Sequence, residues 1–308
     1  KANSTFAFIG DYMKKMLFRG VATALVTPFS DDGTKVDFEA FKKLIDNQIE
    51  NGVSALVFLG TTGEPATMSQ DECDEVIKFA VDYVNHRVPV IAGAGSNNTC
   101  VATQKSRRYE EFGVDGLLHV TPYYNKSTQS GLVAHFTQIA NSTRLPIILY
   151  NVPGRTGVNI SPTTLKTLSK IPNIVAVKEA SGNIEQITEI IRICGDDLTV
   201  YSGDDGLTYS ILALGGTGVI SVASNVVPKQ MSELCSSYFC EDIKKAREIQ
   251  FELLPLIKTL FVEVNPIPAK TALSYLGMIG PALRLPLTPM SDENKQKLIN
   301  ELNRVLSV

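Results

Sequence analysis

Apolar and polar positions divide the chain into two kinds of segment that alternate. Short runs such as 21–27 and 174–177 are mostly apolar and contain many β-branched residues. Runs of this kind are typical of parallel strands that are buried on both faces. The segments between them repeat apolar residues at helical spacing, as Phe41 and Leu44 do after Asp37, a residue type that favours a helix N-cap. The pattern therefore predicts strand–helix units that follow one another along the chain.

The repeat comprises eight strand–helix units. The predicted strands cover residues 21–27, 53–59, 88–92, 115–120, 145–150, 173–178, 198–201 and 216–221. Eight consecutive units without a domain break predict an α/β fold, the (β/α)8 TIM barrel, in which all strands end at the same face. A doubly wound sheet is the alternative. It usually has fewer strands, and its Gly-rich fingerprint is missing after the first strand.

The two ends of the chain depart from this repeat. We expect a catalytic barrel domain over residues 18–241 and a C-terminal helical region over residues 242–308. The helices predicted after the barrel cover 241–264, 266–278 and 292–306. Pro255 should bend the first of them. Residues 1–17 show no clear period and lack the long apolar core of a signal peptide, so we expect a leader, a cloning remnant or a disordered extension there.

Composition and charge exclude several classes of protein. The chain has 308 residues, of which 44% are hydrophobic, and it has no apolar stretch of the roughly 18 residues that a membrane-spanning helix needs. The net charge of −3 and the lack of a basic patch give no reason to expect nucleic acid as a partner. The five cysteines include no CxxC pair, and the three histidines show no metal-ligand spacing. We therefore expect a cytoplasmic protein without a metal site or disulfide framework.

Lys178 is the most informative single residue, because it follows the apolar run 174–177. A buried strand has no use for an ammonium group in its interior, and barrel enzymes place their active sites at the carboxyl ends of their strands. Burial disfavours the charged form of a lysine and lowers its pKa, and a neutral amine can attack a carbonyl to form a Schiff base. The alternative is a lysine whose side chain extends from the strand end into solvent.

Other polar side chains follow the neighbouring strands. Tyr150 ends the adjacent strand, so its phenol can lie near the Lys178 amine. Hydroxyls from Thr61 and Tyr124 can share a hydrogen bond with that phenol and pass protons. Arg155 offers a forked donor for a carboxylate. Singly, these residues have plainer explanations, namely a turn-stabilising hydroxyl, a core or interface aromatic and a solvated loop arginine.

We interpret three further residues near strand ends as structural and not catalytic. Asp204 and Asp205 follow the seventh strand, and we interpret both as caps of the next helix. Cys100 follows the third strand, and we interpret it as an ordinary helix residue rather than a nucleophile.

Six short motifs occur in the order and spacing of a known family. They are Gly60-Thr-Thr-Gly-Glu64, Thr121-Pro-Tyr-Tyr-Asn125, Tyr150-Asn-Val-Pro-Gly-Arg-Thr-Gly157, Val177-Lys-Glu-Ala180, Ser202-Gly-Asp-Asp205 and Gly218-Val-Ile-Ser-Val222. From about Phe18 to the C-terminus the chain resembles the dihydrodipicolinate synthase (4-hydroxy-tetrahydrodipicolinate synthase) family. The resemblance implies a class I pyruvate-dependent aldolase of the N-acetylneuraminate lyase superfamily, usually a homotetramer built as a dimer of dimers. It implies condensation of pyruvate with L-aspartate 4-semialdehyde, the first committed step of diaminopimelate and lysine biosynthesis, with no metal or organic cofactor.

The resemblance also implies roles for the catalytic residues. Lys178 matches the lysine that forms the imine with pyruvate, and Tyr150 matches the tyrosine that shuttles protons. Thr61 matches the relay threonine between that tyrosine and a second one. Tyr124 matches this second tyrosine, which reaches in from the neighbouring subunit.

Four positions match substrate-binding residues of the family. Arg155 matches the residue that holds the semialdehyde carboxylate, and Thr62 matches the threonine that binds the pyruvate carboxylate. Gly203 and Ile220 match backbone contacts near the imine.

Two alternatives share the scaffold. One is another pyruvate-dependent aldolase, either N-acetylneuraminate lyase or a 2-keto-3-deoxy-sugar-acid aldolase, which would keep the lysine and its tyrosine. Arg155 and the pairing of Tyr124 with Thr61 favour the synthase, because a sugar-acid site needs hydroxyl partners more than a carboxylate clamp. The other is a non-catalytic barrel that binds a 2-oxo acid, but such a protein would be expected to lose Lys178 or Tyr150.

One part of the sequence departs from the family. Relatives that lysine inhibits carry histidines and a glutamate in an allosteric pocket, where this chain has Gln70, Cys73 and Val101. Asn97 and Tyr123 still fit that pocket. The α-amino group of lysine would lack its carboxylate partner, so we expect weak or absent feedback inhibition by lysine.

Overall fold

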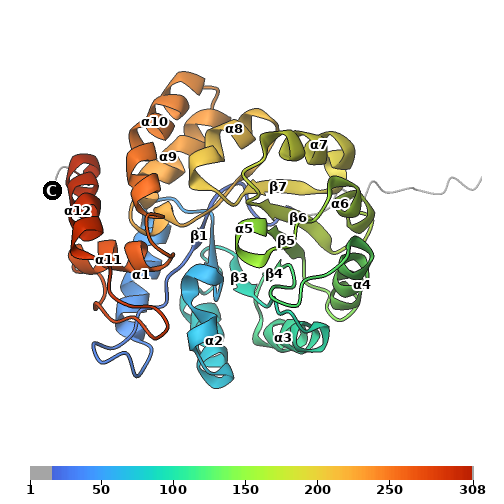
Figure 1. The fold of residues 1–308 in the computed structure, drawn as a ribbon, viewed down its shortest axis with the longest axis horizontal. Helices are drawn as coiled ribbons and strands as arrows, with labels where there is room; N and C mark the ends of the chain where they lie inside the picture. Colours follow the sequence, from blue (N-terminus) through green and yellow to red (C-terminus); the bar gives the residue numbers. More distant parts are fainter. Residues whose placement is uncertain (1–15, 307–308) are drawn as a thin grey trace, which may run out of the picture.

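The computed structural model describes residues 16–306 and shows a closed barrel of eight parallel strands in chain order (Figure 1). The strands are β1 (Gly20–Ala24), β2 (Ala55–Phe58), β3 (Val90–Gly93), β4 (Gly116–Val120), β5 (Ile147–Asn151), β6 (Ile174–Glu179), β7 (Thr199–Ser202) and β8 (Gly218–Ser221). The barrel closes where Gly20 of β1 pairs with Gly218 of β8. A Cβ on Gly218 would lie 1.9 Å from the Gly20 carbonyl oxygen, so only glycine allows this approach. The predicted barrel is confirmed.

Helices surround the strands and form the outer layer (Figure 1). They are α1 (Phe38–Glu50), α2 (Gln70–Val84), α3 (Thr99–Phe112), α4 (Gln129–Ala140), α5 (Pro153–Thr156), α6 (Pro162–Leu168), α7 (Ile184–Cys194), α8 (Thr208–Ala213) and α9 (Pro228–Phe239). Their starts follow from local chemistry. The Asp37 carboxylate accepts from the Ala40 amide, and Ser69 and Glu72 form a reciprocal capping box.

Single turns of 3-10 helix lie between these elements: η1 (Thr61–Gly63), η2 (Pro65–Thr67), η3 (Gly195–Asp197), η4 (Asp205–Leu207) and η5 (Ala223–Asn225). Four of them, η1, η2, η4 and η5, follow β2, β7 or β8, at the ends of the strands where we expect the site. Asn225 of η5 fixes this face to β1, since its amide donates to the Ala24 carbonyl (2.8 Å) and accepts from Val26 N–H (3.1 Å).

Small side chains fill the barrel interior. Ala22, Ala55 and Ala176 are fully or almost fully buried there beside larger residues such as Ile148. The stacked rings of Phe18 and Tyr201 lie in the same cluster, 4.1 Å apart, and the Tyr201 hydroxyl donates to the Phe18 carbonyl (2.7 Å). Because Phe18 precedes β1, this pair closes the end of the barrel opposite the strand-end loops.

The C-terminal region contributes α10 (Ile243–Thr259), α11 (Ile267–Tyr275) and α12 (Asp292–Leu306), and α11 and α12 lie farthest from the barrel axis on one side of the molecule (Figure 1). The prediction of one helix over 241–264 was too long. Phe261, Val262 and Val264 continue the apolar pattern, but each is more than 40% exposed in the turns after Thr259. The predicted α12 is confirmed, and the bend at Pro255 stays a prediction.

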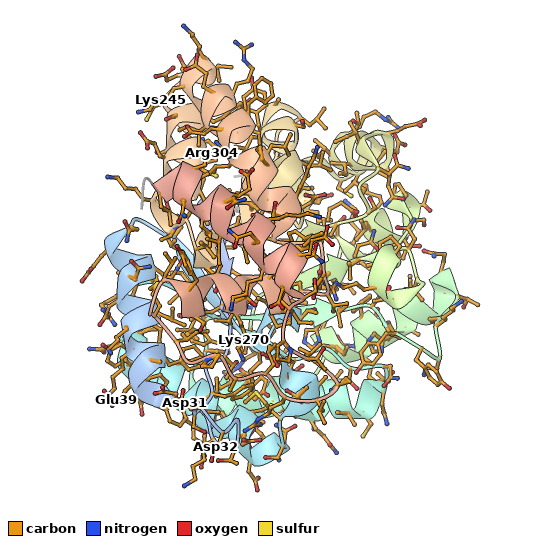
Figure 2. The ribbon with its side chains drawn as sticks, turned by 60° about the vertical axis from the view of Figure 1, so that its left-hand side comes forward. Asp31, Asp32, Glu39, Lys245, Lys270 and Arg304 are labelled. Carbon is orange, nitrogen blue, oxygen red and sulfur yellow. The ribbon has the colours of Figure 1, made fainter. Side chains whose placement is uncertain are left out.

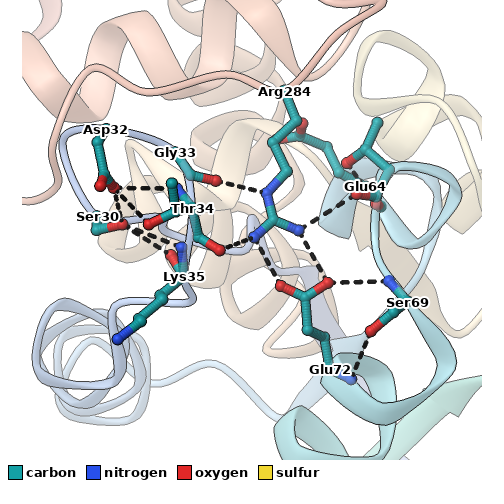
Figure 3. A network of polar contacts seen from close by, with 10 residues as sticks. Ser30, Asp32, Gly33, Thr34, Lys35, Glu64, Ser69, Glu72 and Arg284 are labelled. Atoms are coloured by element: carbon teal, nitrogen blue, oxygen red, sulfur yellow. Dashed lines mark hydrogen bonds and ion pairs between the residues drawn. The ribbon is translucent and has the colours of Figure 1, made fainter.

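Two basic residues, the buried Lys270 and the partly buried Arg284, fix the C-terminal region to the loops of the barrel. Lys270 of α11 lies in the interior, in contrast to Lys245 and Arg304 on the outer helices (Figure 2), and its Nζ is 2.7 Å from Glu64 Oε1. Arg284 donates to the Gly33 carbonyl (2.7 Å) and to both carboxylate oxygens of Glu72 (Figure 3). The C-terminal region is therefore attached directly to the strand-end face.

The interpretation of the two chain ends remains a prediction. Most of the segment 1–17 lies outside the described residues, and the boundary near residue 241 stays an interpretation of the sequence. Among residues 16–306, no helix has both the length and the apolar composition needed to cross a membrane.

Candidate active site

Lys178 and Tyr150 lie side by side at the carboxyl ends of β6 and β5. The strand register pairs Tyr150 with Lys178, so both side chains leave the sheet on the same side. The Lys178 Nζ lies 4.3 Å from the centre of the Tyr150 ring. Lys178 is 5% exposed and Tyr150 is 7% exposed, so the lysine does not extend into solvent. The structure contradicts the solvent-exposed alternative for Lys178.

Burial lowers the pKa of Lys178 to about 8. The positive charge of Arg155 lowers this pKa as well, whereas the negative charge of Asp205 opposes the shift. At pH 7 about a tenth of the Lys178 amines are therefore neutral, compared with fewer than about one in a thousand for a lysine in water. Lys178 can supply a neutral amine at ordinary pH.

Tyr150 keeps its proton over the same range. Burial raises the pKa of the Tyr150 phenol to about 12, and the nearby charge of Arg155 only partly opposes this shift. A protonated phenol can donate to an oxygen that develops negative charge and can return the proton later. In the part of the chain that the structure describes, no hydrogen bond joins this phenol to Thr61.

The two acidic residues after β7 have different roles. Asp204 caps η4 as expected, since its carboxylate accepts from the Gly206 amide (2.8 Å). Asp205 is fully buried, and its Oδ2 accepts from the amides of Val222 (3.0 Å) and Ala223 (2.9 Å) after β8. The interpretation of Asp205 as a cap of the next helix was wrong, because its carboxylate binds these two amides after β8 and not an amide of that helix. Asp205 joins the ends of β7 and β8.

Gly203 lies next to Lys178, and Ile220 lies in the barrel interior. A Cβ on Gly203 would lie 3.0 Å from Cγ of Lys178 and 2.7 Å from Cβ of Ala180, so glycine leaves the room that the lysine side chain occupies. The Gly203 amide donates to the Glu179 carbonyl (2.8 Å). Ile220 of β8 is 1% exposed, and it belongs to the interior cluster that contains Tyr150.

Two clefts meet at this face of the barrel, and Tyr150, Val152 and Arg155 line both. One cleft has about 450 Å³ and extends past Gly203 to α10. The other has about 360 Å³ and extends past Thr61. Volumes of this size are typical of small-molecule sites. Arg155 is exposed and lies between the two clefts, where its guanidinium can reach an anionic ligand.

The two threonines of η1 face different surroundings. Thr61 is exposed and lines the smaller cleft, beside Tyr150. Thr62 is 2% exposed, and its Oγ1 accepts a hydrogen bond from the Asn265 amide (2.9 Å). The turn itself is closed by backbone bonds, such as that from the Gly63 amide to the Gly60 carbonyl. The threonine hydroxyls are therefore not needed to form the turn.

Tyr124 is the one predicted catalytic residue that the single chain does not bring into the site. It lies between β4 and α4 with φ of 67°, a left-handed conformation, and its side chain is 92% exposed. It lines neither cleft, although the preceding Tyr123 lines the smaller one. Tyrosine is a residue type that is enriched at protein–protein interfaces.

Sequence reasoning missed two buried polar residues of the site, Asp205 as a link between strands and Asn265 as a partner of Thr62. The first was visible as a carboxylate directly after a strand, but the two amides that bind it lie on a different strand-end loop. The second was visible only as a polar residue before Pro266. Both contacts join segments that are distant in the sequence.

A buried amine with a lowered pKa at the mouth of a barrel can act as a general base or react with a carbonyl group. A phenol that can donate a proton and an arginine that can bind an anion lie on the same side. In fold and site the molecule therefore belongs with the barrel enzymes that act on small carbonyl acids through a lysine imine.

Comparison with known proteins identifies the family. The profile of the Dihydrodipicolinate synthetase family matches residues 17–305, and the chain belongs to this family. The 4-hydroxy-tetrahydrodipicolinate synthase of Alkaliphilus oremlandii is 52% identical over 288 residues, which cover 94% of this chain and 99% of the relative.

Solved structures of relatives agree in fold. Dihydrodipicolinate synthase from Thermotoga maritima matches with a TM-score of 0.93 and 45% identity, over 95% of this chain and all of that one. The enzyme from Cyanidioschyzon merolae, solved with lysine bound, matches with a TM-score of 0.92 and 42% identity, over 96% of this chain and all of that one.

Proposed function

We propose that the chain condenses pyruvate with L-aspartate 4-semialdehyde to form 4-hydroxy-tetrahydrodipicolinate, a lyase reaction at the start of diaminopimelate and lysine biosynthesis. The observation that carries the proposal is the burial of Lys178 beside Tyr150, with a pKa of about 8, in a member of this family. Relatives at about half identity bear the name of this synthase.

The reaction begins with the amine of Lys178 and the phenol of Tyr150 and ends with ring closure. The neutral Nζ of Lys178 attacks C2 of pyruvate, and the carbonyl oxygen leaves as water after taking up protons that Tyr150 delivers. Loss of a methyl proton from the resulting imine gives an enamine. The enamine carbon attacks the aldehyde carbon of the semialdehyde, whose oxygen is protonated. The amino group of the semialdehyde then attacks the imine carbon, which closes the ring and releases Lys178 as a free amine.

Proton transfer needs a path between Tyr150 and bulk water. Thr61 lines the same cleft as Tyr150, and we assign it the relay role between Tyr150 and Tyr124. Because Tyr124 is almost fully exposed in one chain, we infer that it serves the site of a neighbouring copy. We accordingly propose a homo-oligomer, a tetramer made as a dimer of dimers.

Substrate binding needs two anion contacts. The exposed, forked guanidinium of Arg155 can bind the semialdehyde carboxylate in a bidentate way, and Thr62 can bind the pyruvate carboxylate. We assign contacts with the imine region to the backbone of Gly203, which adjoins Lys178, and to that of Ile220. We also infer a cytoplasmic enzyme, since all five cysteines are free.

Parallel assays with different substrates test the proposal. Purified protein is assayed for pyruvate-dependent consumption of aspartate semialdehyde, and in parallel for pyruvate release from N-acetylneuraminate and from 2-keto-3-deoxygluconate. We expect turnover only with the semialdehyde. Arg155→Lys should lower kcat/KM for the semialdehyde by about tenfold or more, because lysine keeps the charge but loses the fork. Cleavage of a sugar acid without semialdehyde turnover would contradict the proposal.

We also propose weak or absent lysine inhibition. Inhibited relatives have polar residues at the positions of Gln70, Cys73 and Val101. Burial raises the pKa of the Cys73 thiol to about 11, so this side chain stays uncharged at neutral pH. Lysine added up to millimolar concentration should leave the initial rate unchanged. Strong inhibition at such concentrations would overturn this proposal, and Val101→Glu should introduce inhibition.

A further inference from the structure

Asn265 reaches the site from the C-terminal region. It lies in the connection between α10 and α11, directly before Pro266, and is 5% exposed. Its Nδ2 donates to the Oγ1 of Thr62 at 2.9 Å, although the two residues are 203 positions apart in the sequence. Neither α10 nor α11 supplies any of the catalytic groups described above. The bond therefore connects the added helices with the predicted pocket for the pyruvate carboxylate.

The direction of this hydrogen bond determines what the threonine can do. A hydroxyl has one proton and two lone pairs, so it can donate once and accept twice. In this structure the amide of Asn265 donates, which uses a lone pair of Thr62 and leaves the hydroxyl proton free. A carboxylate only accepts hydrogen bonds. The proton that remains is the one that a substrate carboxylate needs.

We propose that Asn265 is a positioning residue that holds the Thr62 hydroxyl as a hydrogen-bond donor toward the carboxylate of the 2-oxo acid substrate. The proposal rests on the role proposed above for Thr62. A donor that is already oriented loses less conformational freedom when the ligand binds, and a chain of two hydrogen bonds in the same direction strengthens both. Asn265 therefore acts on the substrate through Thr62.

The second amide atom of Asn265 supports this assignment. Within residues 16–306, its Oδ1 is buried without a hydrogen-bond partner. Buried polar atoms without partners are rare in folded proteins, and each calls for an explanation. If the amide served only to hold the chain in place, a carbonyl partner for the NH2 and a donor for the oxygen would be expected. Here the Nδ2 bond to the Thr62 hydroxyl is the one hydrogen bond of this side chain among the described residues, which points to a functional constraint at Thr62.

A second contact fixes the same two segments. Glu64 follows Thr62 by two residues, and Lys270 follows Asn265 by five. Their buried ion pair of 2.7 Å joins the residue after η1 to α11, independently of the amide. Lys270 therefore provides a matched control, because changing it loosens the same segments without removing the hydrogen bond to Thr62.

The decisive variant is Asn265→Asp, which keeps the shape of the side chain but reverses the hydrogen bond. An aspartate accepts from Thr62, turns the hydroxyl proton away and adds a negative charge. We expect the KM for pyruvate to rise by about tenfold or more, with a smaller change in kcat and little change in KM for the semialdehyde. Asn265→Ala should raise the KM for pyruvate less than Asn265→Asp, because water can replace the lost amide.

Three further variants separate the possible failures. Lys270→Met should lower thermal stability but leave the KM for pyruvate near that of the unchanged protein. Thr62→Val should raise this KM, and adding Asn265→Ala to it should raise it no further. If Thr62→Val leaves the KM unchanged, the role of Thr62 is wrong and the inference falls with it. If Thr62→Val raises the KM but Asn265→Asp does not, or if Lys270→Met raises it as much as Asn265→Asp does, only the positioning role is overturned.

Discussion

At the scale of single residues, the most consequential property of the molecule is the ionisation of Lys178. A lysine side chain in water is almost fully protonated at pH 7, because its pKa is about 10.4. Burial between β5 and β7 changes this balance, and the Arg155 charge adds to it, so that the pKa falls to about 8. The same burial holds the phenol of Tyr150 in its protonated form, with a pKa of about 12. One environment thus provides a nucleophile and an acid together.

The pH dependence of imine formation follows from this pKa. The second-order rate constant for pyruvate adduct formation should rise about tenfold per pH unit below pH 8 and level off above it, because only the neutral amine reacts. Stopped-flow or quench measurements between pH 6 and pH 10 would give the profile. An inflection near 10.5, the ordinary lysine value, would contradict the account.

Burial of Lys178 should also lower stability. The folded-state pKa lies below the unfolded value of 10.5, so folding is penalised fully below pH 8, by about 3 kcal/mol, and the penalty disappears as pH rises toward 10.5. Lys178→Met should therefore abolish turnover and raise the free energy of unfolding at pH 7. The gain should shrink at pH 10. Denaturant titration at the two pH values measures this, and equal gains at both would contradict it.

The juxtaposition of two candidate reactive residues was predictable from the sequence because each stands at the end of an apolar run. Lys178 and Tyr150 occupy such positions, and a barrel brings those positions together. Asp205 was placed correctly but misinterpreted, since a cap is a local contact and its actual partners are amides after β8. The contact between Asn265 and Thr62 could not be predicted, because no pattern in a single sequence indicates which residues 203 positions apart lie together in the fold.

At the scale of elements, the α11 helix is attached to the site by the buried ion pair of Glu64 with Lys270. The Lys270 ammonium also lies 4.1 Å from the centre of the Phe29 ring. Burial raises the pKa of Glu64 even though the lysine charge opposes the shift. Removing one member of such a pair leaves the other charge buried and unpaired, which is the expensive case.

Lys270→Met should accordingly lower the free energy of unfolding by about 3–5 kcal/mol. Adding Glu64→Gln should recover most of the loss, because the remaining buried charge is removed. Lys297→Met on α12 is the control, since it breaks an exposed ion pair with Glu293 and should leave the denaturation midpoint unchanged. A loss at Lys270→Met no larger than at Lys297→Met would refute the structural importance of the pair.

The observed boundaries of strands and helices show how far a hydrophobic pattern alone can predict where an element begins and ends. The strand predicted over 53–59 is observed as Ala55–Phe58, because pairing with neighbours, not apolarity, sets its length. The helix predicted over 241–264 ends at Thr259, where exposed apolar residues follow that the pattern cannot distinguish from buried ones. The short α5 helix escaped prediction, since four residues are too few to show a period.

At the scale of the whole molecule, we propose that Tyr124, which is exposed in one chain, completes the site of a neighbouring copy. The side chain is 92% exposed, on a loop held in a left-handed turn. Mixing inactive variants tests this. A dimer of Tyr124→Phe and Lys178→Ala subunits contains one site with both intact residues if the tyrosine crosses the interface.

Co-refolding these two variants should therefore restore up to about a quarter of the original activity, because about half of the randomly formed dimers are mixed and each has one intact site. Tyr150→Phe mixed with Lys178→Ala is the matched control and should stay inactive, since both residues come from the same chain. Restoration in the control, or none in the test mixture, would contradict delivery of Tyr124 from a neighbour.

We propose that Lys178 forms an imine with pyruvate that goes on to react with aspartate semialdehyde. Borohydride reduction with pyruvate, followed by peptide mass spectrometry, measures it most directly. We predict one pyruvate adduct per chain on Lys178, none in Lys178→Ala, and loss of the adduct when semialdehyde is added before reduction. An unmodified Lys178, or an adduct on another lysine, would contradict the account.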